Sequence, residues 1–451
     1  MNPNQWPSNV VRLLVIVLMM LVATTASAEW KEKVLYSFQD GSDGNTPAGG
    51  VVFDKAGNLY GATSYNSSCG NLLNCGAVFE LSLRHGAWVE TTLHDFQGHA
   101  HHDGGAPVGG VILDASGNVY GTTAYGGTGS CVLLGTAVGC GTVYELSPPA
   151  QTGGKWTYRV LYNFQGGKDG LFPWGDLVFD KLGNLYGATQ FGGGKGTTCN
   201  LYYGGDCGSV FKLSPPKQKG GAWTGKILHR FAGGTDGANP NGGLIFDSKG
   251  AIYGTTYSGG NQGCRYQDET GCGTAFELKP PTKTGGVWTE KVLHRFTDGA
   301  DGAAPVAGLT PANGGIFYGA AAGGGKYQRG LIFRLTPTRN GGWIESVLYD
   351  FLGNQAGQNP GQLTLGSDGN LYGAAAGGQS FNGLIFRLNR PVRGNSWRLT
   401  VLYNFLRSGD GAGPEAGLIF DGAGNLYSTT VVGGDGTSCT NGCGTVFEAS
   451  P

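Results

Sequence analysis

A run of metal-ligand side chains occurs once in the sequence, as His99-Ala-His101-His102-Asp103. His99, His101, His102 and Asp103 bring together three imidazoles and one carboxylate, donors that a transition metal accepts. A metal site normally draws further ligands and supporting hydrogen bonds from other segments, and no second cluster accompanies this run. Two interpretations stay open, a weak metal site and a solvated loop. The missing second segment favours the loop.

A second set of residues combines aromatic rings with polar side chains, and its members depart from their counterparts in the repeats described below. The set consists of Phe172, Trp174, Asp176, Tyr202, Tyr203, Arg265, Tyr266, Tyr327 and Arg329. Trp174, for example, stands where other repeats have Ala48, Val108, Asn241 or Val306. Aromatic faces stack on sugars and peptides, and the polar groups add directional hydrogen bonds. The set predicts a glycan-binding or protein-binding surface, unless Trp174 packs under its own loop.

Acidic residues recur at one matching place in six of the seven repeats: Asp43, Asp103, Asp169, Asp236, Asp301 and Asp410. A ring of carboxylates could hold a divalent cation, because hard cations bind oxygen ligands. A short acidic side chain also accepts hydrogen bonds from its own turn, and a role repeated in each unit is more often structural. We therefore predict turn-stabilising acids and no cofactor, with a divalent cation as the alternative.

The sequence lacks the catalytic motifs that carry common hydrolytic and phosphate chemistry. It contains no Gly-x-Ser-x-Gly elbow, no Walker phosphate loop and no His-Glu-x-x-His zinc motif. This favours a non-enzymatic binding protein. The alternative is a metal-dependent hydrolase or lyase, as some propellers are.

These residues are carried by seven copies of one unit. Each copy opens with the phrase Trp-x-x-x-(Val/Ile/Thr)-Leu-(Tyr/His)-x-Phe, and the copies begin near Trp30, Trp88, Trp156, Trp223, Trp288, Trp343 and Trp397. Four short apolar segments follow one another in each unit, separated by Gly, Pro, Asn and Asp. Four strands repeated seven times predict an all-β fold, a seven-bladed β-propeller over residues 29–451.

The phase of the repeat predicts how the ring closes. The chain enters the first unit with the Trp30 to Phe38 segment and ends with the Gly444 to Glu448 segment. If the Trp segment is the outer strand of a blade, the last unit supplies three strands and the N-terminal strand completes it. Such closure removes free sheet edges. In this arrangement the loops between the second and third strands share one face with the loops between blades, and binding is expected there.

The repeated turns carry a resemblance to a known family. The segments Asp54-Lys-Ala-Gly-Asn-Leu-Tyr-Gly61, Asp114-Ala-Ser-Gly-Asn-Val-Tyr-Gly121 and Asp180-Lys-Leu-Gly-Asn-Leu-Tyr-Gly187, with Gly-Thr-Val-Phe-Glu-Leu closures, resemble the Gloeo/Verruco (GloVer) tandem-repeat proteins of bacteria. That family is defined by its repeat and implies no activity. A weaker similarity, limited to this turn, extends to NHL and gluconolactonase-like propellers, which is the type of the hydrolase alternative.

The ten cysteines fall into close pairs in the loops between the second and third strands. The pairs are Cys69/Cys75, Cys131/Cys140, Cys199/Cys207, Cys264/Cys272 and Cys439/Cys443. Repeats 5 and 6 lack both cysteines of the pair. Cysteines that are present or absent together are typical of disulfides in an exported protein. No histidine stands at ligand spacing beside the pairs, which argues against zinc.

The N-terminus predicts the compartment. Residues 1–28 combine Arg12, the apolar run Leu13 to Ala23 and the small-residue site Ala26-Ser27-Ala28, as a cleaved signal peptide does. The run is too short for a membrane span, so we expect no span in the mature chain and a secreted or periplasmic bacterial protein. A formal net charge of −1 gives no support for a nucleic-acid partner. We expect a monomer that binds an extracellular or periplasmic glycan or protein.

Overall fold

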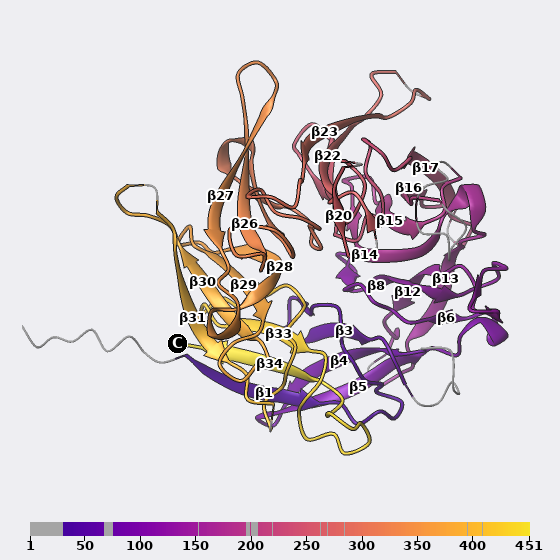
Figure 1. Ribbon diagram of the computed structural model, residues 1–451. Coiled ribbons are helices and arrows are strands. Elements are labelled where there is room, and N and C mark those ends of the chain that lie inside the picture. Colours follow the sequence, from indigo (N-terminus) through magenta and orange to yellow (C-terminus); the bar gives the residue numbers. More distant parts are fainter. Residues whose placement is uncertain are drawn as a thin grey trace, which may run out of the picture.

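The computed structural model describes residues 30–66, 75–151, 153–194, 199, 206–218, 220–261, 263–267, 269–283, 285–394, 396–407 and 409–451. Within these ranges the chain forms seven four-stranded antiparallel sheets arranged as blades of a ring (Figure 1). The described residues contain no α-helix and no helix with the length and hydropathy of a membrane span. The predicted seven-bladed β-propeller is confirmed.

The innermost strand is shorter than the outermost strand in five blades, and longer in blades III and VI. Blade I consists of β2 (Val52–Phe53), β3 (Leu59–Thr63), β4 (Ala77–Arg84) and β5 (Ala87–Asp95), and blade II of β7 (Ile112–Leu113), β8 (Val119–Thr123), β12 (Thr142–Ser147) and β13 (Thr157–Asn163). Blade III, whose inner strand is long as well, consists of β14 (Leu171–Phe179), β15 (Leu185–Phe191), β16 (Ser209–Ser214) and β17 (Thr224–Arg230), and blade IV of β18 (Ile245–Phe246), β19 (Ile252–Thr256), β22 (Thr274–Lys279) and β23 (Thr289–Arg295).

The remaining blades complete the ring. In the same order from inside to outside, blade V consists of β24 (Thr310–Ala312), β25 (Ile316–Ala321), β26 (Leu331–Pro337) and β27 (Trp343–Asp350), blade VI of β28 (Gln358–Leu365), β29 (Leu371–Ala376), β30 (Leu384–Asn389) and β31 (Arg398–Asn404), and blade VII of β32 (Ile419–Phe420), β33 (Leu426–Thr430), β34 (Thr445–Ser450) and β1 (Lys31–Ser37). Short ribbons pair β6 (Gly104–Gly105) with β9 (Tyr125–Gly126), β10 (Val132–Leu133) with β11 (Thr136–Ala137), and β20 (Arg265–Tyr266) with β21 (Glu269–Thr270).

The last blade contains both ends of the propeller. β1 pairs antiparallel with β34, from Lys31 opposite Ser450 to Ser37 opposite Thr445. In Figure 1 the indigo β1 lies along the yellow β34. The first strand is therefore the outer strand of blade VII, and blade VII contacts blade I through the hydroxyl of Thr429, which donates to the carbonyl of Gly49 at 3.0 Å.

The hydrophobic core lies between neighbouring blades. The phenylalanine that ends each Trp phrase is fully buried, and Phe38, for example, meets Phe79 of the next blade edge-on at 5.0 Å. Gly61 makes room for that ring, because a Cβ at Gly61 would lie 2.5 Å from the Phe79 side chain. Edge-to-face aromatic pairs stabilise such seams beyond their buried area.

The Asp-x-x-Gly-Asn turns between the first and second strands are closed by their own acid. Oδ1 of Asp54 accepts hydrogen bonds from the backbone N–H groups of Ala56 and Asn58, and Oδ2 accepts from the amide of Asn58 and the hydroxyl of Tyr60. The same arrangement recurs at Asp114, Asp180 and Asp421. These acids stabilise the hairpin turns, because their carboxylate oxygens accept hydrogen bonds from the turn itself.

A second repeated contact joins each blade to the next. The residue before the inter-blade proline has a positive φ in all seven repeats: Thr46, Ala106, Phe172, Asn239, Ala304, Asn359 and Gly413. Its N–H donates to a carbonyl of the preceding blade, which belongs to Cys443, Cys75, Cys140, Cys207, Cys272, Arg329 and Asn382 in the same order. We refer to this as the inter-blade latch. In five repeats the accepting residue is the second cysteine of its pair, so the cysteine loops support the latch.

Four of the five predicted disulfides are present. They join Cys131 to Cys140, Cys199 to Cys207, Cys264 to Cys272, and Cys439 to Cys443. The fifth predicted pair includes Cys69, which lies outside the described residues.

Candidate ligand-binding pocket

The repeated acids of the inter-blade loops are hydrogen-bonded to tyrosine or histidine side chains of the preceding strand. The pairs and their donor–acceptor distances are Tyr36–Asp43 at 3.0 Å, His94–Asp103 at 3.0 Å, Tyr162–Asp169 at 2.6 Å, His229–Asp236 at 3.2 Å, His294–Asp301 at 3.0 Å and Tyr403–Asp410 at 2.9 Å. In most of these pairs the acid also accepts a backbone N–H of its own loop, such as that of Gln97 on Asp103. The acids therefore act as turn residues, as the sequence predicts.

The histidine run of repeat 2 is divided between these local contacts. Asp103 faces His94, while Nδ1 of His99 lies 2.7 Å from the carbonyl oxygen of Gly127. His101 and His102 are exposed. Within the described part of the chain, no three His, Cys, Asp or Glu side chains are grouped as a metal site. A metal at this run stays a prediction.

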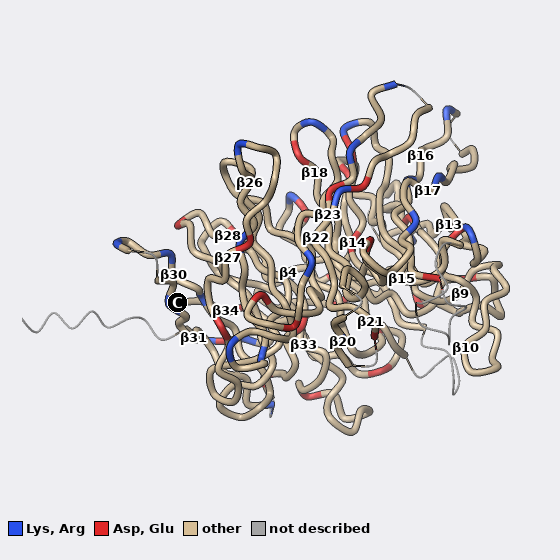
Figure 2. The backbone as a smooth tube through the Cα atoms, turned by 45° about the horizontal axis from the view of Figure 1, so that its top comes forward, with Lys and Arg blue, Asp and Glu red and all other residues tan. Residues whose placement is uncertain are grey.

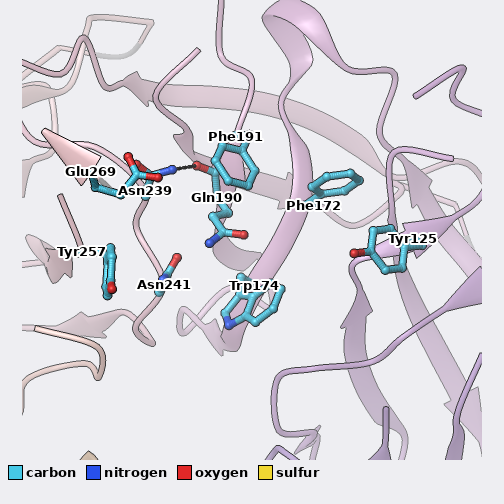
Figure 3. A pocket seen from close by; sticks show the side chains of 9 residues that line it. All are labelled: Tyr125, Phe172, Trp174, Gln190, Phe191, Asn239, Asn241, Tyr257 and Glu269. Atoms are coloured by element: carbon cyan, nitrogen blue, oxygen red, sulfur yellow. Dashed lines mark hydrogen bonds between the residues drawn. The ribbon is translucent and has the colours of Figure 1, made fainter. Parts of the chain in front are cut away.

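A pocket of about 380 Å³ opens where blades II, III and IV meet. Its lining residues are Tyr125, Phe172, Trp174, Gln190, Phe191, Asn239, Asn241, Tyr257 and Glu269 (Figure 3). They come from β14, the ends of β15 and β9, the loops before and after blade IV's inner strands, and β21. The volume is within the range of small-molecule sites, and the lining mixes aromatic with amide side chains, as such sites do.

The aromatic part of the pocket has a fixed and an accessible portion. Phe172 and Phe191 are buried, and Phe172 packs edge-on against Tyr125 at 5.0 Å. Trp174, Tyr257 and Tyr125 are only half-buried. In Figure 3, Asn241 lies between Tyr257 on one side and Trp174 on the other, and Gln190 lies above Trp174. These three rings are the aromatic side chains of the lining that stay partly exposed.

Trp174 is held on a strand. The inner strands of blades I, II, IV and VII have two residues each, whereas β14 has nine. The added length pairs with β15, where Trp174 stands opposite Ala188 and Pro173 opposite Thr189. A side chain on a paired strand is positioned more rigidly than one on a loop.

Amide groups supply the polar part of the pocket. Asn239 is fixed, because its Oδ1 accepts from the hydroxyl of Ser258 at 2.6 Å and its Nδ2 donates to the carbonyl of Gln190 at 3.4 Å. Asn241 differs, since its Oδ1 is buried and has no hydrogen-bond partner among the described residues. A buried polar atom without a partner costs about 1–3 kcal/mol, so this side chain is strained where it lines the pocket.

One acidic residue belongs to the lining of the pocket. Glu269 lies in the lining, and no Lys, Arg or His of the described chain belongs to it. Burial raises the pKa of Tyr257 to about 12, and its hydroxyl donates to Oε1 of Gln267 at 3.0 Å. Over the described chain, Lys and Arg are scattered among strands and loops and mixed with acids (Figure 2). The pocket therefore offers aromatic faces, neutral amides and one carboxylate.

The structure brings only part of the predicted surface together. Phe172 and Trp174 line the pocket. Asp176 follows on the same strand, where it accepts a hydrogen bond from the N–H of Gly110 at 2.6 Å. Asp176 itself is exposed. Tyr266 packs edge-on against Tyr257, with ring centroids 6.1 Å apart.

The other predicted residues lie away from the pocket lining. Arg265 is exposed on β20, Tyr327 is 44% exposed beside Lys326, and Nη1 of Arg329 donates to Gln358 at 3.2 Å at the start of blade VI. Tyr202 and Tyr203 lie outside the described residues. The residues predicted from the sequence come from repeats 3 to 5, whereas the pocket lies over blades II to IV.

Two lining residues could have been found from the repeat. Gln190 lies near the end of β15 and Tyr257 directly follows β19, both at the repeat position of Ser64, Ala124 and Ala322. Each is a large polar replacement of a small residue, the same signal that identifies Trp174. Tyr125, Phe191 and Asn239 carry no such signal.

Fold and pocket together define a disulfide-braced β-propeller with a pocket of small-molecule size on its loop-rich face. The Gloeobacter/Verrucomicrobia repeat matches residues 21–265, 131–341 and 264–451, and the chain belongs to this repeat family. No curated protein matches the sequence significantly.

Solved structures resemble this chain at low sequence identity. A fungal alcohol oxidase of the AA5 family, in complex with copper, has a TM-score of 0.51 and 14% identity over 93% of this chain and 76% of its own. A luciferin-regenerating enzyme has a TM-score of 0.43 and 12% identity, covering 76% and 90% of the two chains. A putative glucose dehydrogenase from Thermus thermophilus has a TM-score of 0.40 and 15% identity, covering 93% and 100%. At these identities the likeness concerns the fold alone.

Proposed function

We propose that the protein is an exported, non-enzymatic propeller that binds a glycan or protein partner in the pocket of blades II to IV. The observation that carries the proposal is the pairing of the half-buried Trp174 ring with the buried, unpartnered Oδ1 of Asn241 in one pocket. An aromatic face with a few placed polar groups is the usual composition of a binding site. The latch and the disulfides hold the loops around it.

Export is part of the proposal. Four disulfides are formed, and disulfides persist in oxidising compartments. Residues 1–28 have the composition of a cleaved signal peptide. Detection of the mature chain, beginning at Glu29, outside the cytoplasm would test this part.

The binding test compares three proteins on arrays of glycans and peptides. Wild-type protein should retain at least one ligand. Trp174→Val should lose it, because valine removes the ring while matching the residue that repeats 2 and 5 carry there. Val306→Ala, a change at the same position in blade V, is the control and should bind as wild type does. An array without any ligand, or unchanged binding by Trp174→Val, overturns the proposal.

A further inference from the structure

The hairpins between the third and fourth strands differ from the rest of the chain in their charge. Six blades have such a hairpin, over residues 84–87, 148–156, 215–223, 280–288, 338–342 and 390–397. Each contains at least one Lys or Arg and none contains Asp or Glu, although acids outnumber Lys and Arg in the whole chain. One exposed cation from each hairpin, in blade order, is Arg84, Lys155, Lys217, Lys283, Arg339 and Arg393. We refer to these hairpins as the cationic rim.

The cationic rim lies at the periphery of the face opposite the pocket. In each blade the third and fourth strands are the outer ones, and the antiparallel order puts their hairpin at the other end of the blade from the inter-blade loops. In Figure 2, blue segments stand at the tips of the loops that project beside the labels β26 and β30. The Asp turns share this face but lie nearer the axis, and their acids, such as Asp54, are hydrogen-bonded within the turn. The hairpin tips at the periphery therefore carry positive charge only.

The cations of the rim are not ion-paired. Within the described part of the chain, no ion pair joins any of the six to a carboxylate. The hairpins themselves are held by the neighbouring blade, since Arg159 donates to the carbonyl of Gly220 at 3.3 Å and Lys291 donates to the carbonyl of Gly341. The rim thus presents cations without ion pairs on loops that are tied to the ring.

Apolar side chains accompany the cations on three hairpins. Leu83, near the end of β4, is 59% exposed, Val287 is 82% exposed and Val392 is 98% exposed. A soluble anionic polymer would pair with Lys and Arg and leave these side chains in water. The interface of a bilayer accepts both kinds of group, because its headgroups can be anionic and its acyl boundary is apolar. The three hairpins belong to blades I, IV and VI, so a flat partner is the kind that reaches all of them at once.

We infer that the cationic rim docks the propeller on an anionic lipid bilayer, with Lys and Arg toward the headgroups and Leu83, Val287 and Val392 at the acyl boundary. The disc then lies flat, and the pocket on the opposite face stays open to solvent. The inference goes beyond the proposed function and does not depend on what the pocket binds. Each cation near an anionic surface strengthens binding about fivefold, so several hairpins together give reversible attachment.

The first test is sedimentation with lipid vesicles. The mature chain, residues 29–451, is used because the apolar run Leu13 to Ala23 would bind lipid by itself. The protein should sediment with vesicles of phosphatidylglycerol mixed with phosphatidylcholine, and not with vesicles of phosphatidylcholine alone. High salt should release it, because salt screens exposed charges. Equal binding to the two kinds of vesicle, or binding to neither, overturns the inference.

A rim variant measures how much the hairpin cations contribute. It combines Lys217→Gln, Lys283→Gln and Arg339→Gln, from the neighbouring blades III, IV and V. Its affinity for the mixed vesicles should fall on the order of a hundredfold, from three cations at about fivefold each. Its unfolding temperature should match that of wild type, because all three side chains are exposed. Unchanged affinity in this variant overturns the inference.

A control variant removes the same charge from the other face. It combines Lys168→Gln, Lys326→Gln and Arg407→Gln, three exposed cations on the inter-blade and second-to-third-strand loops. It should melt and bind vesicles as wild type does. A loss of affinity equal to that of the rim variant would show that total charge and not the rim attracts the lipid, and would overturn the inference.

A fluorescent label tests which face meets the lipid. Val392 and Phe381 are 98% and 73% exposed at opposite ends of blade VI. An environment-sensitive dye on Val392→Cys should shift to shorter emission wavelengths when mixed vesicles are added, and the same dye on Phe381→Cys should not shift. The reverse pattern would place the loop-rich face on the membrane and overturn the inference.

Dextran sulfate, a soluble polyanion, tests the alternative partner. If wild type binds dextran sulfate, the rim variant does not, and neither binds vesicles, the rim recognises an anionic polymer and the bilayer is the wrong partner. Vesicle binding with the label shift at residue 392 supports the bilayer, whether or not the polyanion competes.

Discussion

Nε2 of His94 lies 3.0 Å from Oδ2 of Asp103, and the same contact between a ring and an acid occurs at six of the seven blade junctions. Tyrosine makes it in three of them and histidine in the other three. The seventh junction has Tyr349 and, in place of the acid, Ala356. The contact explains why either ring is accepted, since both present a donor at this distance.

The ring–acid contact is expected to stabilise the propeller. Asp301→Ala removes the acceptor of His294 and of the Thr297 hydroxyl, and should cost about 1–3 kcal/mol of unfolding free energy. His294→Tyr keeps a donor and should cost less than about 0.5 kcal/mol, within the range of substitutions that break nothing. Chemical denaturation of both variants tests this. Equal stabilities for the two variants would contradict it.

A half-buried glutamate beside one such contact makes stability fall as the pH rises toward neutrality. Burial raises the pKa of Glu345 to about 7, His294 opposes the rise, and Asp301 and Asp350 add to it. The folded state therefore retains a proton that the unfolded state has released at about pH 4.5, so stability is lost as pH rises from about 4.5 through 7.

Glu345→Gln removes this titration. The variant should match wild type at about pH 4 and exceed it above about pH 7.5 by on the order of 1 kcal/mol, less than the full shift because solvent screens a half-buried group. Denaturant melts at the two pH values test the sign. If the variant is more stable than wild type at about pH 4, or no more stable above about pH 7.5, the pKa of the Glu345 carboxyl is not raised in the folded state.

The disulfides are expected to stabilise the ring through the latch. Cys272 is bonded to Cys264, and its carbonyl accepts the N–H of Ala304 in the next blade at 2.8 Å. Replacing both cysteines by serine should cost about 2–3 kcal/mol in the chain-entropy estimate for so short a loop. A reductant should lower the unfolding temperature of wild type further than that of the variant. If the reductant lowers the unfolding temperature of wild type and variant equally, this disulfide contributes nothing to stability.

The repeat made the fold predictable, because each strand, turn and cysteine pair is specified several times. The Asp54 turn and the four described disulfides follow from residue type and spacing alone. The pocket was less predictable. Trp174 and Phe172 were found as departures from the repeat, but the orientation of Arg329 toward Gln358 depends on packing that spacing does not encode.

The unpartnered state of Asn241 is also invisible in the sequence. The repeat shows only that a polar residue stands where Val108 and Val306 stand in other blades. Its side-chain oxygen is buried and has no hydrogen-bond partner among the described residues. Asn239, two residues away, has a positive φ of 56°, and its side chain accepts a hydrogen bond from Ser258. Two asparagines of one loop thus differ in their hydrogen bonds, which residue type and spacing do not encode.

Chelation should leave the protein unchanged. The acids that could form a cation ring already accept hydrogen bonds, as Asp410 does from Tyr403 and from the N–H of Leu406. We expect that EDTA shifts the unfolding temperature by less than about one degree, on the order of measurement error for a domain of this size. A bound divalent ion in elemental analysis together with a loss of stability in EDTA would support the cation alternative instead.

Removal of the first strand should destabilise the whole ring. β1 pairs with β34 along its length, and Leu35 and Phe38 are buried against blade I. Deleting residues 29–40 exposes the edge of β34 and opens the core cluster between blades VII and I, so we expect a loss of at least about 5 kcal/mol, from two core side chains and a strand edge. The mature chain, which lacks only residues 1–28, is the reference for this comparison. Because all blades meet in one closed ring, the loss should appear as a lower melting temperature of the entire propeller and not as a separate early transition. A truncated protein that kept its melting temperature would show that the strand pairing does not hold the ring closed.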